Sequence, residues 1–546
     1  MAKPKKTIWF KRDTAPTIAI RKMEITETDN KIIVSGTCVM KLLRSLRRID
    51  TDLIRLDIPV KEDAIKISFG SRFGRRLFGG IYANTFRLEI DIDEARDYDI
   101  QNKLIPVYKD KYKGRFLYSV NDIKWGHNKN SRIIVRDGVA MYFRQTKYNT
   151  LTFTVRDANI YDTPEGQARL EKAIIKAKEL KNNDIVLMYE KNCSKYEESA
   201  SVLYEKIIDR GYDNVFFIVD TTIPAVAELP EKYKKNLIEK DSDKHLEYFF
   251  ACKKFISSET LDHALQLRIA NRYAQDKLKG KGLSYVFLQH GVMYMVSLSS
   301  KLRLGFRKNF NFKLQKTVVS SKLEAKHFID LAYMDEDDLY ITGLAKFDTS
   351  YRYDNADKII IMPTWRRWET NQAKYDIKHT GYYKMIERMY NSVPDNLKEK
   401  VIILPHPLMI ERFKDEKEGI GAHLMITDSY DKTLRECSML ITDYSSIAYD
   451  AYYRGANVAF WWDEKDECME HYGEEAYLML NEDNVFGPVC MNENDLTNAI
   501  NELYDMPQKD EDLKKYREIV EFHDGRNSER IIEKLIADSM LKSKEQ

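Results

Sequence analysis

The chain has 546 residues, 43% hydrophobic and 32% charged, a composition typical of a globular protein with several domains. Its 88 Lys and Arg residues nearly balance 86 Asp and Glu residues, and the formal net charge of +2 excludes a polycation; we expect no nucleic-acid partner. Because no run of 18 apolar residues and no apolar segment near the first residue is present, neither a transmembrane helix nor a signal peptide is expected. The six cysteines form no CxxC pair, which favours reduced thiols over a zinc site or disulfides.

The first 158 residues alternate between apolar and polar side chains, as antiparallel strands do. Leu88 and Ile90 fall on one face of such a segment, and Asp137-Gly138 between two apolar runs is typical of a hairpin turn. Asp91-Ile92-Asp93 resembles the metal-binding DxD of some glycosyltransferases, but the same alternation assigns it to the polar face of a strand. These patterns predict a β-sandwich-like domain.

Beyond residue 160, short apolar runs alternate with amphipathic helical segments, the rhythm of βαβ units and a parallel sheet. The polar stretch 351–357 separates two such sets, so we predict two doubly wound lobes that bind a ligand at the carboxyl ends of their strands. The strands expected are 184–189, 215–219, 254–257, 285–288, 317–320 and 339–342, then 358–362, 401–404, 424–427, 439–442 and 457–461. The domains expected are a basic segment at 1–13, a β-rich domain at 14–158, and lobes at 159–350 and 351–546.

Polar residues that directly follow the predicted strands are the candidates for chemistry. His290 has the side chain of a general base near neutral pH, and His406, between two prolines, is suited to hydrogen-bonding a phosphate or to acid–base catalysis. Ser445 and Ser446 precede a helical segment whose free N–H groups favour an anion. Arg366 and Arg367 can supply forked cationic donors to a pyrophosphate.

Each of these features has a plainer interpretation when taken alone. A single loop histidine is more often structural, a Ser-Ser pair before a helix is more often an N-cap, and Pro-His-Pro is a turn. Their common position at strand ends of two lobes favours one shared site. The remaining eight histidines show no metal-ligand spacing, and no P-loop, GxGxxG or GxSxG motif is present.

A basic stretch with interleaved aromatic residues follows His290. It is either a solvated surface or a patch that contacts an anionic acceptor polymer or lipid headgroups. The N-terminal basic segment is a further candidate for contact with a membrane surface. The charged residues of the patch are Lys301, Arg303, Arg307 and Lys308.

Six motifs, in this order, resemble the CDP-glycerol glycerophosphotransferase family of teichoic acid polymerases and primases over roughly residues 185–535. They are His290-Gly291, Pro363-Thr364-Trp365-Arg366, Pro405-His406-Pro407, Ile441-Thr442-Asp443-Tyr444-Ser445-Ser446 with Ala448-Tyr449-Asp450, Phe486-Gly487-Pro488, and Asp524-Gly525-Arg526-Asn527-Ser528-Glu529-Arg530. The resemblance implies a GT-B fold, a CDP-polyol donor, and peripheral association with the cytoplasmic face of a bacterial membrane, where a lipid-linked acceptor would lie.

The resemblance also implies roles for single residues. His290 would be the base and His406 a second essential histidine near the phosphates. Phosphates of the CDP-polyol would lie at Ser445 and Ser446, with Arg526 and Arg530 nearby. In the same loops we assign Thr364, Arg366 and Asp443 to donor binding.

The chain departs from the family pattern at two motifs. The usual Trp-His-Gly-Thr reads Gln289-His290-Gly291-Val292, and the usual Gly-x-Pro-Arg-x-Asp reads Gly343-Leu344-Ala345-Lys346-Phe347-Asp348. These changes bear on which donor and acceptor the chain uses more than on which fold it adopts.

The sequence therefore predicts a GT-B phosphotransferase that moves the polyol phosphate of CDP-glycerol, or of another CDP-polyol, to a hydroxyl of a lipid-linked anionic polymer and releases CMP. Neither a metal nor a cofactor is expected, because cationic side chains can stabilise the phosphate charge and the CDP-polyol is a substrate. A nucleotide-sugar glycosyltransferase and a non-catalytic polymer-binding module are the alternatives. The sequence does not decide which polyol is transferred, or whether the chain acts as a primase or a polymerase. It also leaves open whether the product is a teichoic acid or a capsule, and whether the chain forms a homo-oligomer.

Overall fold

A computed structural model describes residues 17–41, 54–57, 65–70, 81–96, 105–108, 112–113, 115–118, 133–145, 151–180, 184–265, 282–308, 316–369, 372–373, 376–406, 409–413, 417–427 and 429–542. The chain divides into two compact units, residues 1–175 with 268–279 and residues 176–267 with 280–546. The basic segment predicted at residues 1–13 lies outside the described ranges.

The first unit is built from β-sheets whose described strand pairs are antiparallel, except for the parallel pair β1–β8. The strands of the largest sheet, in spatial order, are β4 (Ile65–Gly70), β5 (Ile81–Asp91), β2 (Lys31–Lys41), β1 (Thr17–Glu27) and β8 (Arg115–Tyr118). Two further sheets contain β11 (Leu151–Asp157), β10 (Val139–Gln145) and β9 (Ile134–Arg136), and β3 (Ile54–Asp57), β6 (Ile105–Tyr108) and β7 (Tyr112–Lys113). Ile20 and Leu88 of the largest sheet share a core with Met141 and Phe153 of the second, so alternating apolar residues hold the two together.

Two local predictions in this unit have different outcomes. The hairpin turn is confirmed, because Asp137 (φ 45°) and Gly138 (φ 78°) join β9 to β10 in left-handed conformations. The assignment of Asp91-Ile92-Asp93 to a strand face is wrong beyond Asp91, where β5 ends and the short helix α1 (Ile92–Arg96) begins. Asp91 Oδ1 accepts a hydrogen bond from the Glu94 N–H at 3.1 Å, so this carboxylate caps the helix.

The second unit begins with a seven-stranded sheet whose strand pairs are all parallel, which confirms the predicted fold class. Its order is β14 (Leu237–Glu239), β13 (Val215–Val219), β12 (Val186–Tyr189), β15 (Lys254–Ser257), β16 (Ser284–Phe287), β17 (Lys316–Val319) and β18 (Leu339–Ile341). Six of these strands lie where the sequence placed them. The sequence analysis did not predict β14.

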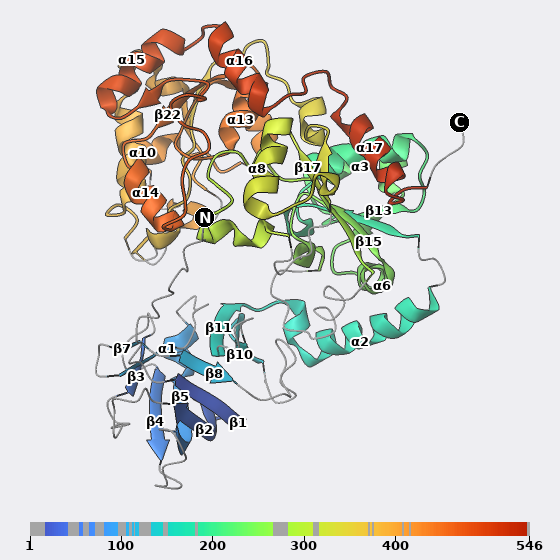
Figure 1. Ribbon diagram of the computed structural model, residues 1–546, viewed down its shortest axis with the longest axis vertical. Coiled ribbons are helices and arrows are strands. Elements are labelled where there is room, and N and C mark those ends of the chain that lie inside the picture. Colours follow the sequence, from blue (N-terminus) through green and yellow to red (C-terminus); the bar gives the residue numbers. More distant parts are fainter. Residues whose placement is uncertain are drawn as a thin grey trace, which may run out of the picture. The chain divides into compact units, whose positions relative to one another are not determined.

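A second parallel sheet follows in the order β20 (Val401–Ile403), β19 (Lys358–Ile361), β21 (Cys437–Thr442), β22 (Asn457–Trp461) and β23 (Val489–Cys490). The strand predicted at 424–427 is not formed, because Leu424 makes only a single bridge to Ile403. Both sheets are flanked by helices (Figure 1), which explains why their strands are apolar on both faces.

Polar caps define many helix starts: the side chains of Ser242, Ser321, Thr380 and Ser429 each accept a backbone N–H of the helix that follows. The earlier helices are α2 (Pro164–Glu179), α3 (Ser199–Asp209), α4 (Pro224–Ala227), α5 (Glu231–Lys234), α6 (Asp243–Ala251) and α8 (Lys322–Ala332). The later helices are α10 (Gly381–Asn391), α11 (Ile410–Phe413), α12 (Tyr430–Arg435), α13 (Ile447–Tyr453), α14 (Lys465–Tyr472), α15 (Glu493–Leu503), α16 (Asp510–Ile519) and α17 (Asn527–Ala537).

The last helix, α17, packs on the first lobe, beside α3 (Figure 1). The carboxylate of Asp348 accepts hydrogen bonds from the N–H groups of Asn527 and Ser528 at 2.8 and 2.7 Å, and so caps α17. The Tyr340 hydroxyl donates to Asp538 just beyond the helix. This helix therefore lies outside the lobe, 351–546, in which the sequence analysis placed it.

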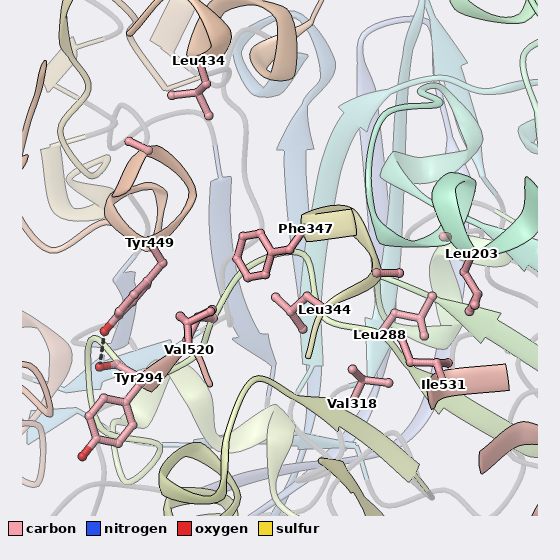
Figure 2. Packing of buried hydrophobic residues seen from close by; sticks show 14 of the residues in the cluster. Leu203, Leu288, Tyr294, Val318, Leu344, Phe347, Leu434, Tyr449, Val520 and Ile531 are labelled. Atoms are coloured by element: carbon pink, nitrogen blue, oxygen red, sulfur yellow. Dashed lines mark hydrogen bonds between the residues drawn. The ribbon is translucent and has the colours of Figure 1, made fainter. Parts of the chain in front are cut away.

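The two lobes share one apolar core. Tyr294 and Met295 of the first lobe belong to the same buried cluster as Tyr449 and Leu480 of the second. Figure 2 shows the Tyr449 hydroxyl donating a hydrogen bond to the main-chain carbonyl of Tyr294, at 2.8 Å. The loops that follow the two sheets are consequently held in fixed positions relative to each other.

Candidate functional site

His290 lies in a loop that directly follows β16 and is anchored on both sides. Gln289, with a left-handed φ of 59°, donates from Nε2 to the Val318 carbonyl at 2.6 Å. The buried carboxylate of Glu324 accepts from Gln289 Nε2 at 3.3 Å and from the Met293 N–H at 2.6 Å. Gln289 and Gly291 are buried whereas His290 is exposed, so the loop presents the imidazole outward.

The surroundings of His290 keep its imidazole neutral at pH 7. Its ring is exposed to solvent yet closely surrounded by protein atoms, and this loss of hydration lowers its pKa. Of its charged neighbours, Glu198 and Glu259 oppose the decrease in pKa, and Lys191 and Lys346 add to it. A neutral, accessible imidazole is the form that can accept a proton.

The loop of His290 meets the second lobe at Ser446. A Cβ atom placed on Gly291 would lie 2.9 Å from Ser446 Oγ, so any larger residue would force the serine side chain to move. Ser446 occupies the N-cap position of α13, and the neighbouring Ser445 Oγ accepts from the Ile447 N–H at 3.4 Å. Two motifs that are 155 residues apart in the sequence are therefore neighbours, as their common place at strand ends suggested.

Lys346 contacts both the loop of His290 and helix α13. Its Nζ donates to the His290 carbonyl at 2.8 Å and forms an ion pair of 2.5 Å with Asp450 of α13. The Lys that departs from the family pattern thus connects the loop of the predicted base to the helix that begins at Ser446.

His406 directly follows β20 and is stacked on Trp365. The ring centroids are 5.4 Å apart with an interplanar angle of 25°, and the His406 N–H donates to the Tyr382 hydroxyl at 3.2 Å. Burial, followed by the positive charges of Arg367 and Lys191, lowers the pKa of His406 to about 4. His406 is therefore a neutral hydrogen-bonding group at pH 7.

Asp443 and Thr364 join the loops after β21 and β19. Asp443 is buried, and its Oδ1 accepts from the N–H groups of Thr364 at 2.7 Å and Tyr444 at 2.6 Å. Burial raises the pKa of this carboxyl group. These contacts give Asp443 the geometry of a residue that shapes the loops, rather than of a direct phosphate ligand.

The assignment of Arg366 to phosphate binding is not supported by its position. Its side chain is 3% exposed, and Nη2 pairs with Glu464 at 2.6 Å. The guanidinium also lies 5.7 Å from the Trp368 ring centroid. The adjacent Arg367 is exposed and stands 5.6 Å above Trp365, beside His406, so it is the better-placed cation of this loop.

Arg526 and Arg530 lie at the start of α17, and both are paired with acids. Arg526 bonds Glu529 at 2.8 Å, while Arg530 pairs with Asp524 and donates to Asn527 Oδ1 at 3.0 Å. A ligand that used either guanidinium would have to compete with these exposed pairs.

The predicted basic patch is not a row of free cations. Lys308 pairs with both Asp335 and Asp338, and Arg307 lies 5.4 Å above the Tyr333 ring. Loss of hydration lowers the pKa of Arg303, whose side chain is partly buried. The side chain of Lys301 lies outside the described part of the structure.

Sequence reasoning missed the segment after β12, where Lys191 is paired with Glu198 at 2.8 Å. Lys191 influences the pKa of both His290 and His406, so it belongs to the same region. The criterion that found the histidines, a polar residue directly after an apolar strand, also applies to this segment.

Among the described residues, no helix is long and apolar enough to cross a membrane, and no three His, Cys, Asp or Glu side chains gather as the ligands of one metal ion would.

Comparisons with known proteins agree with the motifs. The chain is 27% identical over 271 residues to the minor teichoic acid biosynthesis protein GgaB of Bacillus subtilis (strain 168), an alignment covering 45% of this chain and 28% of that relative. The solved structure of the wall teichoic acid polymerase TagF aligns with a TM-score of 0.48 and 15% identity over 68% of this chain and 94% of that one. The sequence model of the CDP-Glycerol:Poly(glycerophosphate) glycerophosphotransferase family matches residues 171–537. The chain therefore belongs to the CDP-Glycerol:Poly(glycerophosphate) glycerophosphotransferase family.

Proposed function

We propose that the chain transfers a polyol phosphate, glycerol phosphate first of all, from a CDP-polyol to a hydroxyl group of a lipid-linked anionic acceptor, with release of CMP. The observation that carries this proposal is that the loop of the exposed, neutral His290 meets Ser446 of the other lobe through Gly291. Membership of the family supports CDP-glycerol as donor. The likeness to GgaB supports a teichoic acid or a related surface polymer as product.

In the proposed reaction, the acceptor oxygen attacks the polyol-bound phosphorus and forms the new P–O bond. His290 takes the hydroxyl proton. The P–O bond to the CMP phosphate breaks, and CMP leaves with the electron pair. Because no covalent enzyme intermediate is needed, positioning and electrostatic stabilisation supply the rate enhancement.

The remaining residues suit binding rather than proton transfer. His406 is neutral at pH 7, since its pKa is about 4, and serves as a hydrogen-bonding partner of a phosphate oxygen. Arg367 supplies the positive charge that the buried Arg366 cannot present. Ser445 and Ser446 offer hydroxyl groups beside the loop of His290.

Acceptor-dependent release of CMP from CDP-glycerol and CDP-ribitol tests the proposal directly. We expect turnover of one donor by the wild type, unchanged by EDTA, and a loss of at least about 10²-fold in His290→Ala, the range typical of a general base. His379→Ala is the matched control, because His379 is an exposed histidine whose imidazole pairs with Asp376. Release of UDP from a UDP-sugar would instead establish a glycosyltransferase, and folded protein that turns over no donor would establish a binding module.

We further propose that the chain works at the cytoplasmic face of the membrane, where its acceptor is anchored. Co-sedimentation with anionic vesicles tests this. Binding that requires the lipid-linked acceptor, and is absent with bare vesicles, would show that the protein is recruited by its acceptor and not by contact of the basic patch with lipid headgroups. This result would agree with the pairing of Lys308 by two carboxylates.

A further inference from the structure

The segment Lys191–Cys193 lies at the topological switch point of the first lobe. In this sheet β12 is flanked by β13 on one side and β15 on the other, so the chain leaves β12 in one direction and later returns on the opposite side. Ligands of open parallel sheets bind beyond the carboxyl ends of the strands at such a point. The switch point here is formed by the loop after β12 and by Ser258 and Glu259 after β15.

The backbone of this segment has an unusual conformation. Lys191, Asn192 and Cys193 have φ angles of 46°, 54° and 58°, three consecutive non-glycine residues in the left-handed region. L-residues adopt this region reluctantly, and such outliers cluster at functional sites, where the surrounding structure imposes them.

Buried carboxylates impose the conformation. Glu190 is fully buried and accepts from the N–H groups of Glu197, Glu198 and Ser201 at 2.5, 2.9 and 3.1 Å. The Asn192 N–H donates to Glu259 Oε2 at 2.7 Å. Glu190 thus fixes the segment that follows the turn, and Glu259 holds the turn itself.

The turn holds Lys191 at the same edge of the sheet as His290, because β12 and β16 lie on either side of β15 and all three strands are parallel. Its Nζ lies 2.8 Å from Glu198 Oε1, and the other oxygen of Glu198 accepts from Ser258 Oγ at 3.0 Å. The Glu198 charge raises the pKa of Lys191, so this ammonium group is charged at neutral pH. Its field reaches His290 of the first lobe and His406 of the second.

We propose that Lys191 binds the polyol-bound phosphate of the donor, and that Glu198 holds its ammonium group in place when the donor is absent. The inference rests on the proposed function and specifies it: a cation beside the base neutralises the phosphate that the acceptor attacks. Lysine suits this role as a compact point charge. Lys346, the other cation that faces His290, is held by two partners, the His290 carbonyl and Asp450, whereas Lys191 is paired with Glu198.

The first test compares binding of CDP-glycerol with binding of CMP by calorimetry. We expect Lys191→Gln to weaken binding of CDP-glycerol on the order of 10- to 100-fold, the range for a lost charge-assisted hydrogen bond, and to change CMP binding less than about threefold. Lys322→Gln, an exposed lysine at the start of α8, is the matched control and should change neither. Equal loss for both nucleotides, or no loss for either, would overturn the proposal.

The second test is the pH profile of kcat/KM. If Lys191 had only a structural role, substitutions of Lys191 and Glu198 would not shift this profile in opposite directions. The charged groups that face His290 are Lys191, Lys346, Glu198 and Glu259. Because Lys191 lowers the pKa of His290 and Glu198 raises it, Lys191→Gln should move the acidic limb to higher pH and Glu198→Gln should move it to lower pH. Shifts in the same direction, or none, would remove Lys191 from the site.

The proposed function and the role of Lys191 can be refuted separately. If the wild type turns over no CDP-polyol, the proposed function is wrong. If the wild type is active and Lys191→Gln matches Lys322→Gln in binding and in pH profile, the function stands and the role of Lys191 is refuted.

Discussion

The Lys346–Asp450 ion pair offers a sharp test of how the two lobes are joined at the site. The two side chains are 11% and 7% exposed, their charges are 2.5 Å apart, and Lys346 also holds the His290 carbonyl. In Lys346→Met, Asp450 keeps only the more distant Arg454, at 4.0 Å. We expect this substitution to destabilise the second unit and to lower activity by loosening the loop of His290.

The magnitude follows from the burial of the pair. Removing one partner of a buried ion pair typically costs about 3–5 kcal/mol, chiefly because the other charge is left uncompensated. The residual contact with Arg454 places Lys346→Met near the lower limit, about 3 kcal/mol. Asp450→Asn in the same chain removes the uncompensated charge, so the double variant should be less destabilised than the sum of the single variants by at least about 1 kcal/mol.

Urea unfolding followed by tryptophan fluorescence measures these free energies, with Lys346→Arg as the charge-preserving control. A cost below about 1 kcal/mol for Lys346→Met, or strict additivity in the double variant, would refute the view that this pair is a buried link between the lobes. A stable Lys346→Met variant with normal kcat would also show that the His290 loop is positioned by Gln289 and Glu324 alone.

Three further predictions concern Arg366, His327 and the thiols. Arg366→Met should lower the melting temperature by several degrees, because Arg366 is buried against Glu464, and should leave KM for CDP-glycerol within about threefold of the wild type. A large rise in KM with normal stability would show instead that Arg366 binds the donor. Burial lowers the pKa of His327 to about 4 against about 6.5 when unfolded, so its contribution to stability is complete above pH 6.5 and is lost as the pH falls towards 4. Between pH 7 and 5 the wild type should lose about 2 kcal/mol more than His327→Gln in urea unfolding, and equal losses would contradict this. The six cysteines are buried and should react with Ellman's reagent only after unfolding. Rapid reaction of the native protein would disprove their burial. The six are Cys38, Cys193, Cys252, Cys437, Cys468 and Cys490.

Much of the site could be read from local sequence because its residues follow apolar strands. A parallel strand buried on both faces is an uninterrupted apolar run, and the residue after it lies at the edge where ligands bind. His290 and His406 were found by this rule, and the proximity of Gly291 to Ser446 confirms that strand ends of the two lobes meet.

The same rule could not separate ligand-binding residues from residues that shape the loops. Arg366 and Arg367 are adjacent in a loop, yet one is buried against Glu464, almost 100 residues away, and the other is exposed. Only the folded chain decides which guanidinium faces the site, because the acid that pairs with it comes from a distant segment.

The sequence by itself determined the alternation of strands and helices, the parallel sheets and the family, since these depend on periodicity and on short motifs. The tertiary structure decided which charges are paired, among them Lys191 with Glu198, and where α17 packs. The physical reason is that pairing energies and loss of hydration depend on distances between residues far apart in the chain, and no local pattern encodes those distances.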